Sequence, residues 1–431
     1  MRVLSLSTNL AGGAGVAASR FHSALGQAGF DSRLLALAGP GEQGPGIFRL
    51  QPSPVRAALL AAGRAATRYA FDYHRYFTLG SAGVGRRIGE VLDVARFAPE
   101  VIVCHWTSRL VSAQDIRVLA DRYRAAVVFH VMDMEPFTGG CHYSLGCARY
   151  ENACGRCPAI WPRWGNDVSR RALDAKRRAL RGLNAAVVVT SEHLLGQARR
   201  SAVFGDVETH KILYGIDPGR FSPGDAAAAR AALGLPEGRR MVFAGAMNIA
   251  NPRKGAALLL RAFEALGGRG AVQPVTIAVA GARAFRLPPD RGNVQFRWLG
   301  YLDPAASLIA AYRAADVFVC PSVDDAGPMM VNEAIMCGTP VVSFDMGVAR
   351  DLVHTGRTGY RAALGNVEDL AHGIERVLSL APGEHASMRR ECRELGTSLM
   401  HPDKQVEQFR RVFEGLLGAG RGSSDASRNA A

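Results

Sequence analysis

The sequence predicts an α/β fold made of two successive domains, each with a parallel sheet between layers of helices. Short apolar runs of strand length alternate with longer helical segments along most of the 431 residues. This alternation is typical of parallel sheets covered by helices. The runs form two sets, separated at 217–224 by the proline- and glycine-rich stretch DPGRFSPG, which indicates a linker. Two such sets predict two Rossmann-like domains facing a central cleft.

The expected strands are short runs rich in valine, leucine and alanine. In the first domain they are 2–8, 32–37, 101–105, 126–131, 185–191 and 211–214. In the second domain they are 241–246, 275–280, 294–298, 317–320 and 340–344, with helices at 254–266, 305–315 and 328–337. We expect domains at 1–218 and 219–402, a C-terminal helix at 403–417, and a disordered tail at 418–431, because that tail is small and polar.

Composition restricts the class of protein. A hydrophobic content of 48% with 21% charged residues is typical of a globular chain. No run reaches the roughly 18 apolar residues that cross a bilayer, and the glycine-rich start MRVLSLSTNLAGGAG predicts a strand and turn and no signal peptide. We therefore expect a cytoplasmic protein. The net charge of +14 favours anionic partners, but the basic residues are dispersed and no nucleic-acid-binding signature occurs, so nucleic acid is not an expected partner.

Segment 54–88 combines arginines with leucines and aromatic residues. Its arginines are Arg56, Arg64, Arg68, Arg75, Arg86 and Arg87. This is the composition of a helix lying on an anionic membrane surface, which predicts a peripheral location at the inner face of the plasma membrane. An ordinary amphipathic helix covering the first sheet explains the same pattern.

Two carboxylates follow the expected strand 317–320. Asp325 lies in the loop before helix 328–337, and Glu333 lies inside that helix, which is apolar on nearly every face and ends at Gly338. A buried carboxylate is costly unless it is hydrogen-bonded, either to a backbone amide or to a ligand such as a ribose. The loop follows a strand at the edge where parallel sheets bind ligands, which favours the ligand.

Two turns are candidate phosphate sites, one marked by a proline and the other rich in glycine. Asn251 and Pro252 predict a helix start with Arg253 and Lys254 in its first turn. Free amides and two cations make an anion site there, although exposed basic residues are common elsewhere. The turn NLAGGAG after the first strand would also let the backbone approach a phosphate.

Four cysteines lie within a candidate insertion at 138–158: Cys141, Cys147, Cys154 and Cys157. Their spacing predicts a structural zinc site, with no coordination position left open for catalysis. An iron–sulfur cluster and four unligated thiols are the alternatives, whereas disulfides are disfavoured in the cytoplasm.

The order of Asp325, seven residues, Glu333, Ala334 and Gly-Thr-Pro-Val-Val resembles the signature of glycosyltransferase family 4, whose members are retaining enzymes of the GT-B fold. The Lys254-Gly255 pair is also similar to that family's. The resemblance implies a hexosyltransferase that uses a UDP- or GDP-sugar, with no cofactor for catalysis, and a last helix that crosses back to the first domain.

The same resemblance implies roles for individual residues. Asp325, which stands where most members have Glu, would contact the donor sugar, and Glu333 the ribose. Lys254 would hold the diphosphate, with Arg253 in place of the arginine that most members carry after the glycine of the strand. Further donor contacts are expected at Gly12, Gly13, Gly245, Gly327, Pro328, Met329 and Met330.

The run 133–143, DMEPFTGGCHY, followed by CGRCP, resembles a family 4 subgroup from exopolysaccharide pathways, including colanic-acid-type enzymes. It implies a lipid-linked saccharide acceptor in cell-surface polysaccharide or lipopolysaccharide synthesis. The subgroup has His before Asp133, where this chain has Met132. His130 or His142 could replace that sugar contact beside Asp133, or be structural. Two other functions are open: a catalytically silent scaffold of an assembly complex, and a soluble sugar synthase or phosphorylase.

Overall fold

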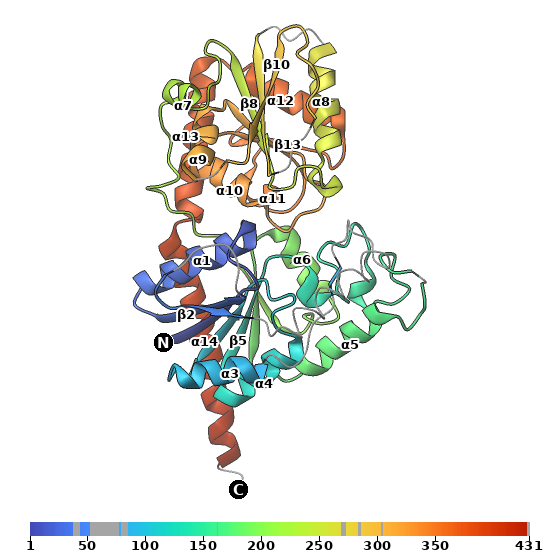
Figure 1. The fold of residues 1–431 in the computed structure, drawn as a ribbon, viewed down its shortest axis with the longest axis vertical. Helices are drawn as coiled ribbons and strands as arrows, with labels where there is room; N and C mark the ends of the chain where they lie inside the picture. The colour runs from blue at the N-terminus through green and yellow to red at the C-terminus, as the bar shows by residue number, and fades with distance from the viewer. Residues whose placement is uncertain are drawn as a thin grey trace. The chain divides into compact units, whose positions relative to one another are not determined.

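The computed structural model describes residues 1–37, 44–51, 77–78, 85–161, 163–268, 273–282, 286–302 and 305–428. The chain forms two compact units (Figure 1). The first comprises Met1–Thr190, Leu194–Leu213 and the C-terminal segment from Pro402, and the second comprises Ser191–His193 and Tyr214–His401. The main junctions therefore fall after Leu213 and after His401, where the expected domain limits were 218 and 402.

Within the described residues, the first unit has a seven-stranded parallel sheet in the order β3-β2-β1-β4-β5-β6-β7. Its strands are β1 (Arg2–Leu6), β2 (Asp31–Leu37), β3 (Ile47–Leu50), β4 (Val101–Cys104), β5 (Ala126–Val131), β6 (Ala185–Val189) and β7 (Glu208–Lys211). Its helices are α1 (Gly12–Gln27), α3 (Gly85–Val94), α4 (Ala113–Tyr123), α5 (Val168–Leu180), α6 (Glu192–Arg200) and α14 (Pro402–Arg428). The chain moves outward from β1 to β3 and returns to β4, so the strand order reverses between β1 and β4.

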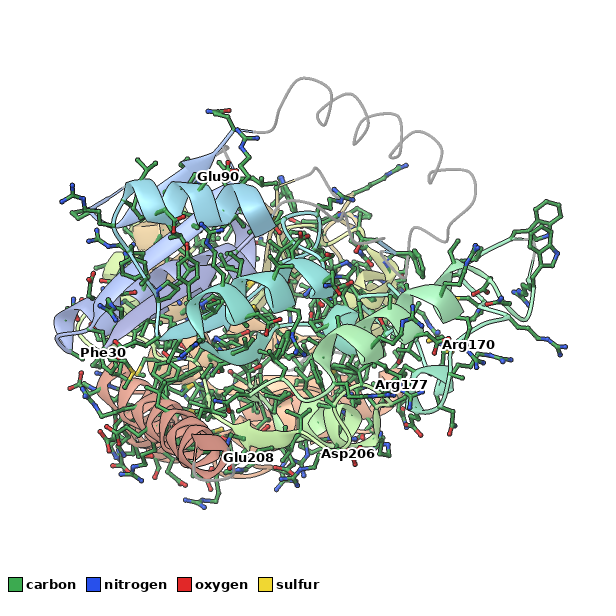
Figure 2. The ribbon with its side chains drawn as sticks, turned by 90° about the horizontal axis from the view of Figure 1, so that it is seen from below. Phe30, Glu90, Arg170, Arg177, Asp206 and Glu208 are labelled. Carbon is green, nitrogen blue, oxygen red and sulfur yellow. The ribbon has the colours of Figure 1, made fainter. Side chains whose placement is uncertain are left out.

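Helix α14 completes the core of the first unit. Phe409 and Phe413 are fully buried against β-strand residues of the sheet, and the ring of Phe409 lies 4.4 Å from that of Phe21 on α1. Phe30 contacts Phe413 with ring centres 6.3 Å apart, and Figure 2 shows Phe30 next to this helix. The helix continues to Arg428, through residues 418–428 that the sequence predicted to be disordered.

The second unit has a parallel sheet that is six-stranded in the residues the structure describes, in the order β10-β9-β8-β11-β12-β13. Its strands are β8 (Arg240–Gly245), β9 (Val275–Ala280), β10 (Val294–Gly300), β11 (Val317–Cys320), β12 (Val341–Phe344) and β13 (Gly359–Ala362). Its helices are α7 (Ala226–Ala232), α8 (Ala256–Gly268), α9 (Ala305–Ala314), α10 (Met329–Met336), α11 (Ala349–Leu352), α12 (Val367–Leu378) and α13 (Pro382–Leu399).

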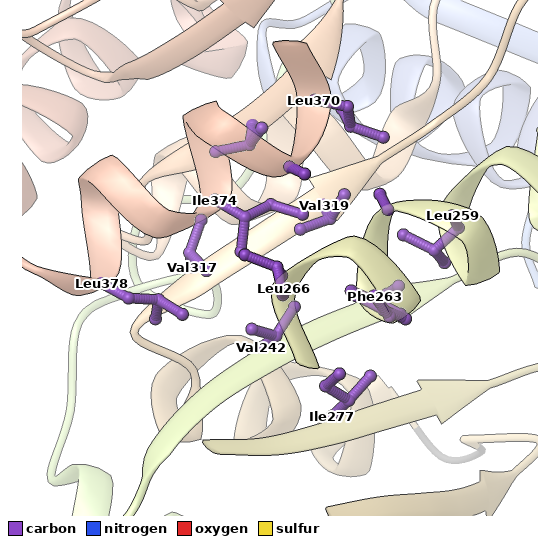
Figure 3. Packing of buried hydrophobic residues seen from close by; sticks show 14 of the residues in the cluster. Val242, Leu259, Phe263, Leu266, Ile277, Val317, Val319, Leu370, Ile374 and Leu378 are labelled. Carbon is purple, nitrogen blue, oxygen red and sulfur yellow. The ribbon is translucent and has the colours of Figure 1, made fainter. Parts of the chain in front are cut away.

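One face of this sheet is covered by α8 and α12. Leu259 and Phe263 of α8 and Ile374 of α12 pack with strand residues such as Val242 and Val319 in a single buried cluster (Figure 3). The central strands are apolar on both faces because helices cover both sides of a parallel sheet. These contacts fix the carboxyl ends of β8 and β11, where the candidate site lies.

The predicted α/β class with parallel sheets is confirmed, and strands 126–131, 275–280 and 317–320 have the predicted limits. Two strands, β3 and β13, are absent from the prediction because they are edge strands and only partly buried, which weakens their apolar pattern. The strand predicted at 211–214 was placed too far along the chain, since β7 occupies Glu208–Lys211.

The arginine-rich segment 54–88 is described only at 77–78 and 85–88. Four of its arginines lie outside the described residues: Arg56, Arg64, Arg68 and Arg75. Arg86 and Arg87 lie on α3. None of the helices in the described part of the chain combines the length and the apolarity that crossing a membrane requires.

Candidate functional site

The strand order of the second unit reverses between β8 and β11. The chain runs from β8 outward to β10 and then returns to β11, on the other side of β8. In open parallel sheets, ligands bind beyond the carboxyl ends of the strands at such a reversal. Here those ends are Gly245 and Cys320, and the two loops that follow them carry the charged residues singled out in the sequence.

These loops bring Arg253, Lys254 and Asp325 together. Arg253 Nη1 lies 2.8 Å from Asp325 Oδ2, and Lys254 Nζ donates to the same oxygen. Asp325 is 8% exposed. Burial alone would raise the pKa of Asp325, but the charges of Lys254 and Arg253 outweigh it and lower the pKa to about 2. The predicted sugar-binding carboxylate and the predicted phosphate-binding cations are therefore ion-paired with one another.

Gly255 allows this close approach. It has a left-handed backbone (φ 70°), and a Cβ there would overlap the carbonyl oxygen of Pro321. Before it, Pro252–Lys254 form a single 3-10 turn, capped by the Asn251 side chain, which accepts the Arg253 amide at 3.1 Å. The Val323 amide donates to the Arg253 carbonyl at 2.8 Å and joins the two loops. The expected helix 254–266 is thus split into this turn and α8, which begins at Ala256.

Glu333 is buried (4% exposed) on α10. The hydroxyl of Tyr312, on α9, donates to its Oε2 at 3.0 Å. Tyr312 is fully buried and was not predicted, because its place in an apolar helix gives no local signal that it meets Glu333. The carboxylate therefore has a side-chain hydroxyl as a partner where the sequence suggested a ribose or a backbone amide.

The glycine and methionine positions of the expected donor site lie around the same loops. The methyl group of Met330 would be 3.1 Å from a Cβ on Gly245, so it lies over the end of β8. Gly327, Met329 and Met330 are partly exposed. Pro328 precedes α10, and its carbonyl accepts the Val331 amide at 3.0 Å.

In the first unit, Gly12 and Gly13 begin α1 after β1. Gly12 has a left-handed backbone (φ 75°), and a Cβ on Gly13 would meet nothing within 4 Å. The turn is tight at Gly15, where a Cβ would overlap the backbone of Leu10. These glycines shape the end of β1, at the point where the strand order of this unit reverses.

Asp133 and His142 form a buried pair beyond β5. His142 Nδ1 lies 2.6 Å from Asp133 Oδ2, and because a carboxylate only accepts, Nδ1 carries the proton. The Trp106 indole donates to the same oxygen at 2.7 Å, and the Thr78 hydroxyl bonds His142 Nε2 at 2.9 Å. Trp106, which follows β4, was missed by the sequence reasoning and is partly exposed.

His130 lies in the core of the first unit. It is fully buried, with its ring centre 5.8 Å from that of Phe21 and 5.1 Å from that of Phe409. Burial lowers its pKa to about 3. Its ring packs between α1 and α14, and the sugar contact stays a prediction for His130.

The four clustered cysteines line one small cavity of about 10 Å³. They are Cys141, Cys147, Cys154 and Cys157, and all are free thiols. Burial raises the pKa of Cys141 to about 12 and that of Cys154 to about 11. No three histidine, cysteine or acidic side chains in the described ranges are positioned to hold a metal ion together. The predicted zinc site is therefore not formed by these residues as they stand.

Comparison with known proteins identifies the second unit. Residues 238–380, which contain both charged loops, match the family described as Glycosyl transferases group 1. The matched range includes Asp325 and Glu333, and it supports the predicted family.

Relatives of the group 1 glycosyltransferase domain include two proteins named D-inositol 3-phosphate glycosyltransferase. The protein from Saccharomonospora viridis is 32% identical over 276 residues, which cover 57% of this chain and 60% of that protein. The protein from Mycobacterium sp. (strain KMS) is 36% identical over 227 residues, which cover 47% of this chain and 49% of that protein. The chain thus spans between half and three fifths of the length of these relatives.

The matches to solved structures extend over both units. Sucrose-phosphate synthase from Thermosynechococcus elongatus has a TM-score of 0.67 at 20% identity, covering 97% of this chain and all of that chain. Anabaena HepE, solved with UDP and glucose, has a TM-score of 0.66 at 16% identity, covering 96% and 99%. WaaG, a glycosyltransferase of lipopolysaccharide biosynthesis, has a TM-score of 0.58 at 15% identity, covering 94% and 98%. These similarities confirm the predicted GT-B fold.

Proposed function

We propose that this chain transfers a hexosyl group from a nucleoside diphosphate sugar to a hydroxyl group, with retention at the anomeric carbon. The observation that carries the proposal is the cluster of Arg253, Lys254 and Asp325 at the strand-order reversal of a group 1 glycosyltransferase domain. Two cations at this edge suit a diphosphate, and one carboxylate beside them suits the hydroxyls of the attached sugar.

The ion pairs suggest how the donor enters. A diphosphate carries more negative charge than one carboxylate, so it competes with Asp325 for Arg253 and Lys254. Once displaced, Asp325 is free to accept hydrogen bonds from the sugar and to orient its anomeric carbon. As the glycosidic bond breaks, both electrons leave with the diphosphate, and the two cations stabilise the charge that develops there.

Glu333 would accept hydrogen bonds from the ribose. The Tyr312 hydroxyl fixes the orientation of that carboxylate. Glu333 lies on α10, the helix that follows the loop carrying Asp325. UDP is the first nucleotide to test, because HepE, a protein of the same fold, was solved with UDP and glucose.

The acceptor would bind to the first unit. Resemblance of 133–143 to the exopolysaccharide subgroup favours a lipid-linked saccharide, which would place the protein at the cytoplasmic face of the membrane. In support, this run forms the buried Asp133–His142 pair that also fixes Trp106 beyond β4. The names of the relatives favour a second acceptor class, a phosphorylated cyclitol such as D-inositol 3-phosphate.

Thermal unfolding with UDP, GDP and ADP tests the donor site, with Glu333→Ala as the comparison. A nucleotide at about one hundred times its dissociation constant should add roughly 2.7 kcal/mol of stability. We expect one nucleotide to stabilise the native chain and to lose this effect in the variant. If none of the three nucleotides stabilises the native chain, the proposal is contradicted.

Incubation with the matching nucleotide sugar tests turnover, and proton NMR of the product reads the anomeric configuration. A product with inverted configuration would contradict the mechanism. Nucleotide binding without consumption of any sugar donor would instead favour the catalytically silent scaffold. Transfer only to small soluble sugars would favour a synthase or phosphorylase.

A further inference from the structure

Two tryptophans of the first unit are unusually exposed. Trp161 is 80% exposed and Trp164 is 69% exposed, whereas tryptophan is on average one of the more buried residue types. Both lie in the loop that leads into α5, directly after the cysteine-rich segment. Neighbouring exposed apolar side chains of this size mark a surface that binds something.

The loop is anchored at both of its ends. Before it, Ile160 packs with Cys157 in a small buried cluster, and its amide donates to the Cys157 carbonyl at 3.1 Å. After it, the Trp164 carbonyl accepts the Arg156 amide at 2.8 Å, and the Asp167 side chain caps α5 while accepting the Cys157 amide at 2.8 Å. The fixed ends hold both tryptophan side chains outside the core.

Exposed arginines lie close to both tryptophans in the sequence. Arg156, Arg163 and Arg171 are all exposed, and Figure 2 shows that Arg170 and Arg177 lie along α5. The acidic side chains near these arginines already have partners within the first unit. Asp167 is buried in the helix cap, Asp174 pairs with Arg170 at 3.1 Å, and Glu151 pairs with Arg200 at 2.9 Å. The surface is therefore both aromatic and positively charged.

We infer that Trp161 and Trp164, together with Arg156, Arg163 and Arg171, dock on an anionic lipid bilayer. Tryptophan prefers the headgroup level of a membrane, where its ring is in an apolar layer and its N–H in a polar one. Arginines beside it are attracted to anionic headgroups. This combination of charge and aromatic surface favours lipid over an apolar protein partner. The inference does not depend on the donor site, since it concerns lipid binding alone.

Co-sedimentation of the full-length chain with lipid vesicles tests the inference. We expect binding to phosphatidylglycerol-containing vesicles, weak binding to pure phosphatidylcholine, and a decrease with added salt. Tryptophan emission should shift to shorter wavelength on binding. The double variant Trp161→Ala/Trp164→Ala should lose about tenfold in affinity together with the emission shift. Arg163→Gln, which keeps both rings, should lose roughly fivefold.

Tyr301→Ala is the matched control, because Tyr301 is an exposed aromatic residue (56%) of the second unit. It should bind vesicles as the native chain does, and all variants should keep the native Tm, since each altered side chain is exposed. Undiminished binding of the double variant would overturn the inference. So would a loss confined to variants of Arg56, Arg64, Arg68 and Arg75, which would place the contact in 54–88. Equal binding to both kinds of vesicle would also overturn it.

Discussion

Asp325 is assigned two partners in the function that we propose. Its carboxylate is held by Arg253 and Lys254 and has a pKa lowered to about 2, so it is an anion at neutral pH. In the proposed mechanism, the same two cations bind the donor diphosphate. Asp325 is then the counter-ion of the free site and a sugar contact in the donor complex, and substitutions should separate these two roles.

Asp325→Asn should bind UDP more tightly and turn over more slowly. The variant removes the carboxylate that competes for the cations, so we expect the affinity for UDP to rise by roughly tenfold. It also weakens the contact that orients the sugar, so turnover should fall by roughly two orders of magnitude. Calorimetry with UDP and a transfer assay measure the two effects.

Asp324→Asn is the control for this substitution. Arg253 bonds the backbone carbonyl of Asp324 at 3.3 Å, which the variant retains. Its UDP affinity and its turnover should therefore stay close to native. Equal losses of affinity and turnover in Asp325→Asn would contradict the exchange of partners.

The same carboxylate should make stability depend on pH. The pKa of Asp325 falls from 3.8 to about 2 on folding, so its ion pairs stabilise the fold fully above about pH 4 and are lost as the pH falls through about 2. The contribution at neutral pH is about 2 kcal/mol. We expect native protein to exceed Asp325→Asn by this amount in urea unfolding, with the difference shrinking below pH 4. A difference that is constant down to pH 2 would refute the lowered pKa.

At the scale of elements, the site depends on how two loops meet. The turn Pro252–Lys254 must lie against the loop after β11, and at Gly255 the two backbones are too close to leave room for a Cβ. The turn carries the two cations and the loop after β11 carries Asp325. The three charged side chains become a site because the sheet places β8 beside β11.

Gly255→Ala should therefore disturb both stability and nucleotide binding. The left-handed backbone costs an alanine about 1 kcal/mol or more, and the overlap with Pro321 should bring the loss to roughly 3 kcal/mol. Displacement of the turn should also weaken stabilisation by UDP. Unfolding in urea, with and without UDP, measures both changes.

Gly292→Ala is the matched control. Gly292 has a similar backbone (φ 54°), but a Cβ there would meet nothing within 4 Å. It should lose only about 1 kcal/mol and keep its response to UDP. If the two variants lose the same stability, the close approach at Gly255 is unimportant.

At the scale of the whole molecule, the chain returns to its first unit. Helix α14 follows the second unit in sequence but packs its phenylalanines into the core of the first. The charged residues proposed to hold the donor belong to the second unit, whereas the tryptophan loop, the Asp133–His142 pair and the glycines Gly12 and Gly13 belong to the first. Stability and donor binding should therefore respond independently to changes in each unit.

Phe409→Ala should destabilise the first unit by about 3–5 kcal/mol, because it removes a fully buried ring from the packed core. Stabilisation of the second unit by UDP should be unchanged. Differential scanning calorimetry, which can resolve the two units, measures both effects. Leu364→Ala, at an exposed leucine (55%) of the second unit, should change stability by less than about 0.5 kcal/mol.

Much of this protein followed from local sequence. Buried parallel strands are apolar on both faces, so runs such as 275–280 and 317–320 were recognisable by composition alone. The edge strands β3 and β13 were not, because they are only partly buried. Asp325 and Glu333 were identified by their spacing, and Arg253 and Lys254 by their place at a helix start. Each of these signals is confined to a short stretch of the chain.

The sequence by itself determined the α/β class, the family resemblance and the residue types of the proposed donor site, since these depend on local pattern and spacing. Only the tertiary structure decided which groups are partners. It paired Asp325 with the two cations, placed Tyr312 against Glu333, and buried His130 between helices. It also left Trp161 and Trp164 exposed. Such contacts join residues far apart in the chain, and they depend on how strands and helices pack rather than on any local pattern.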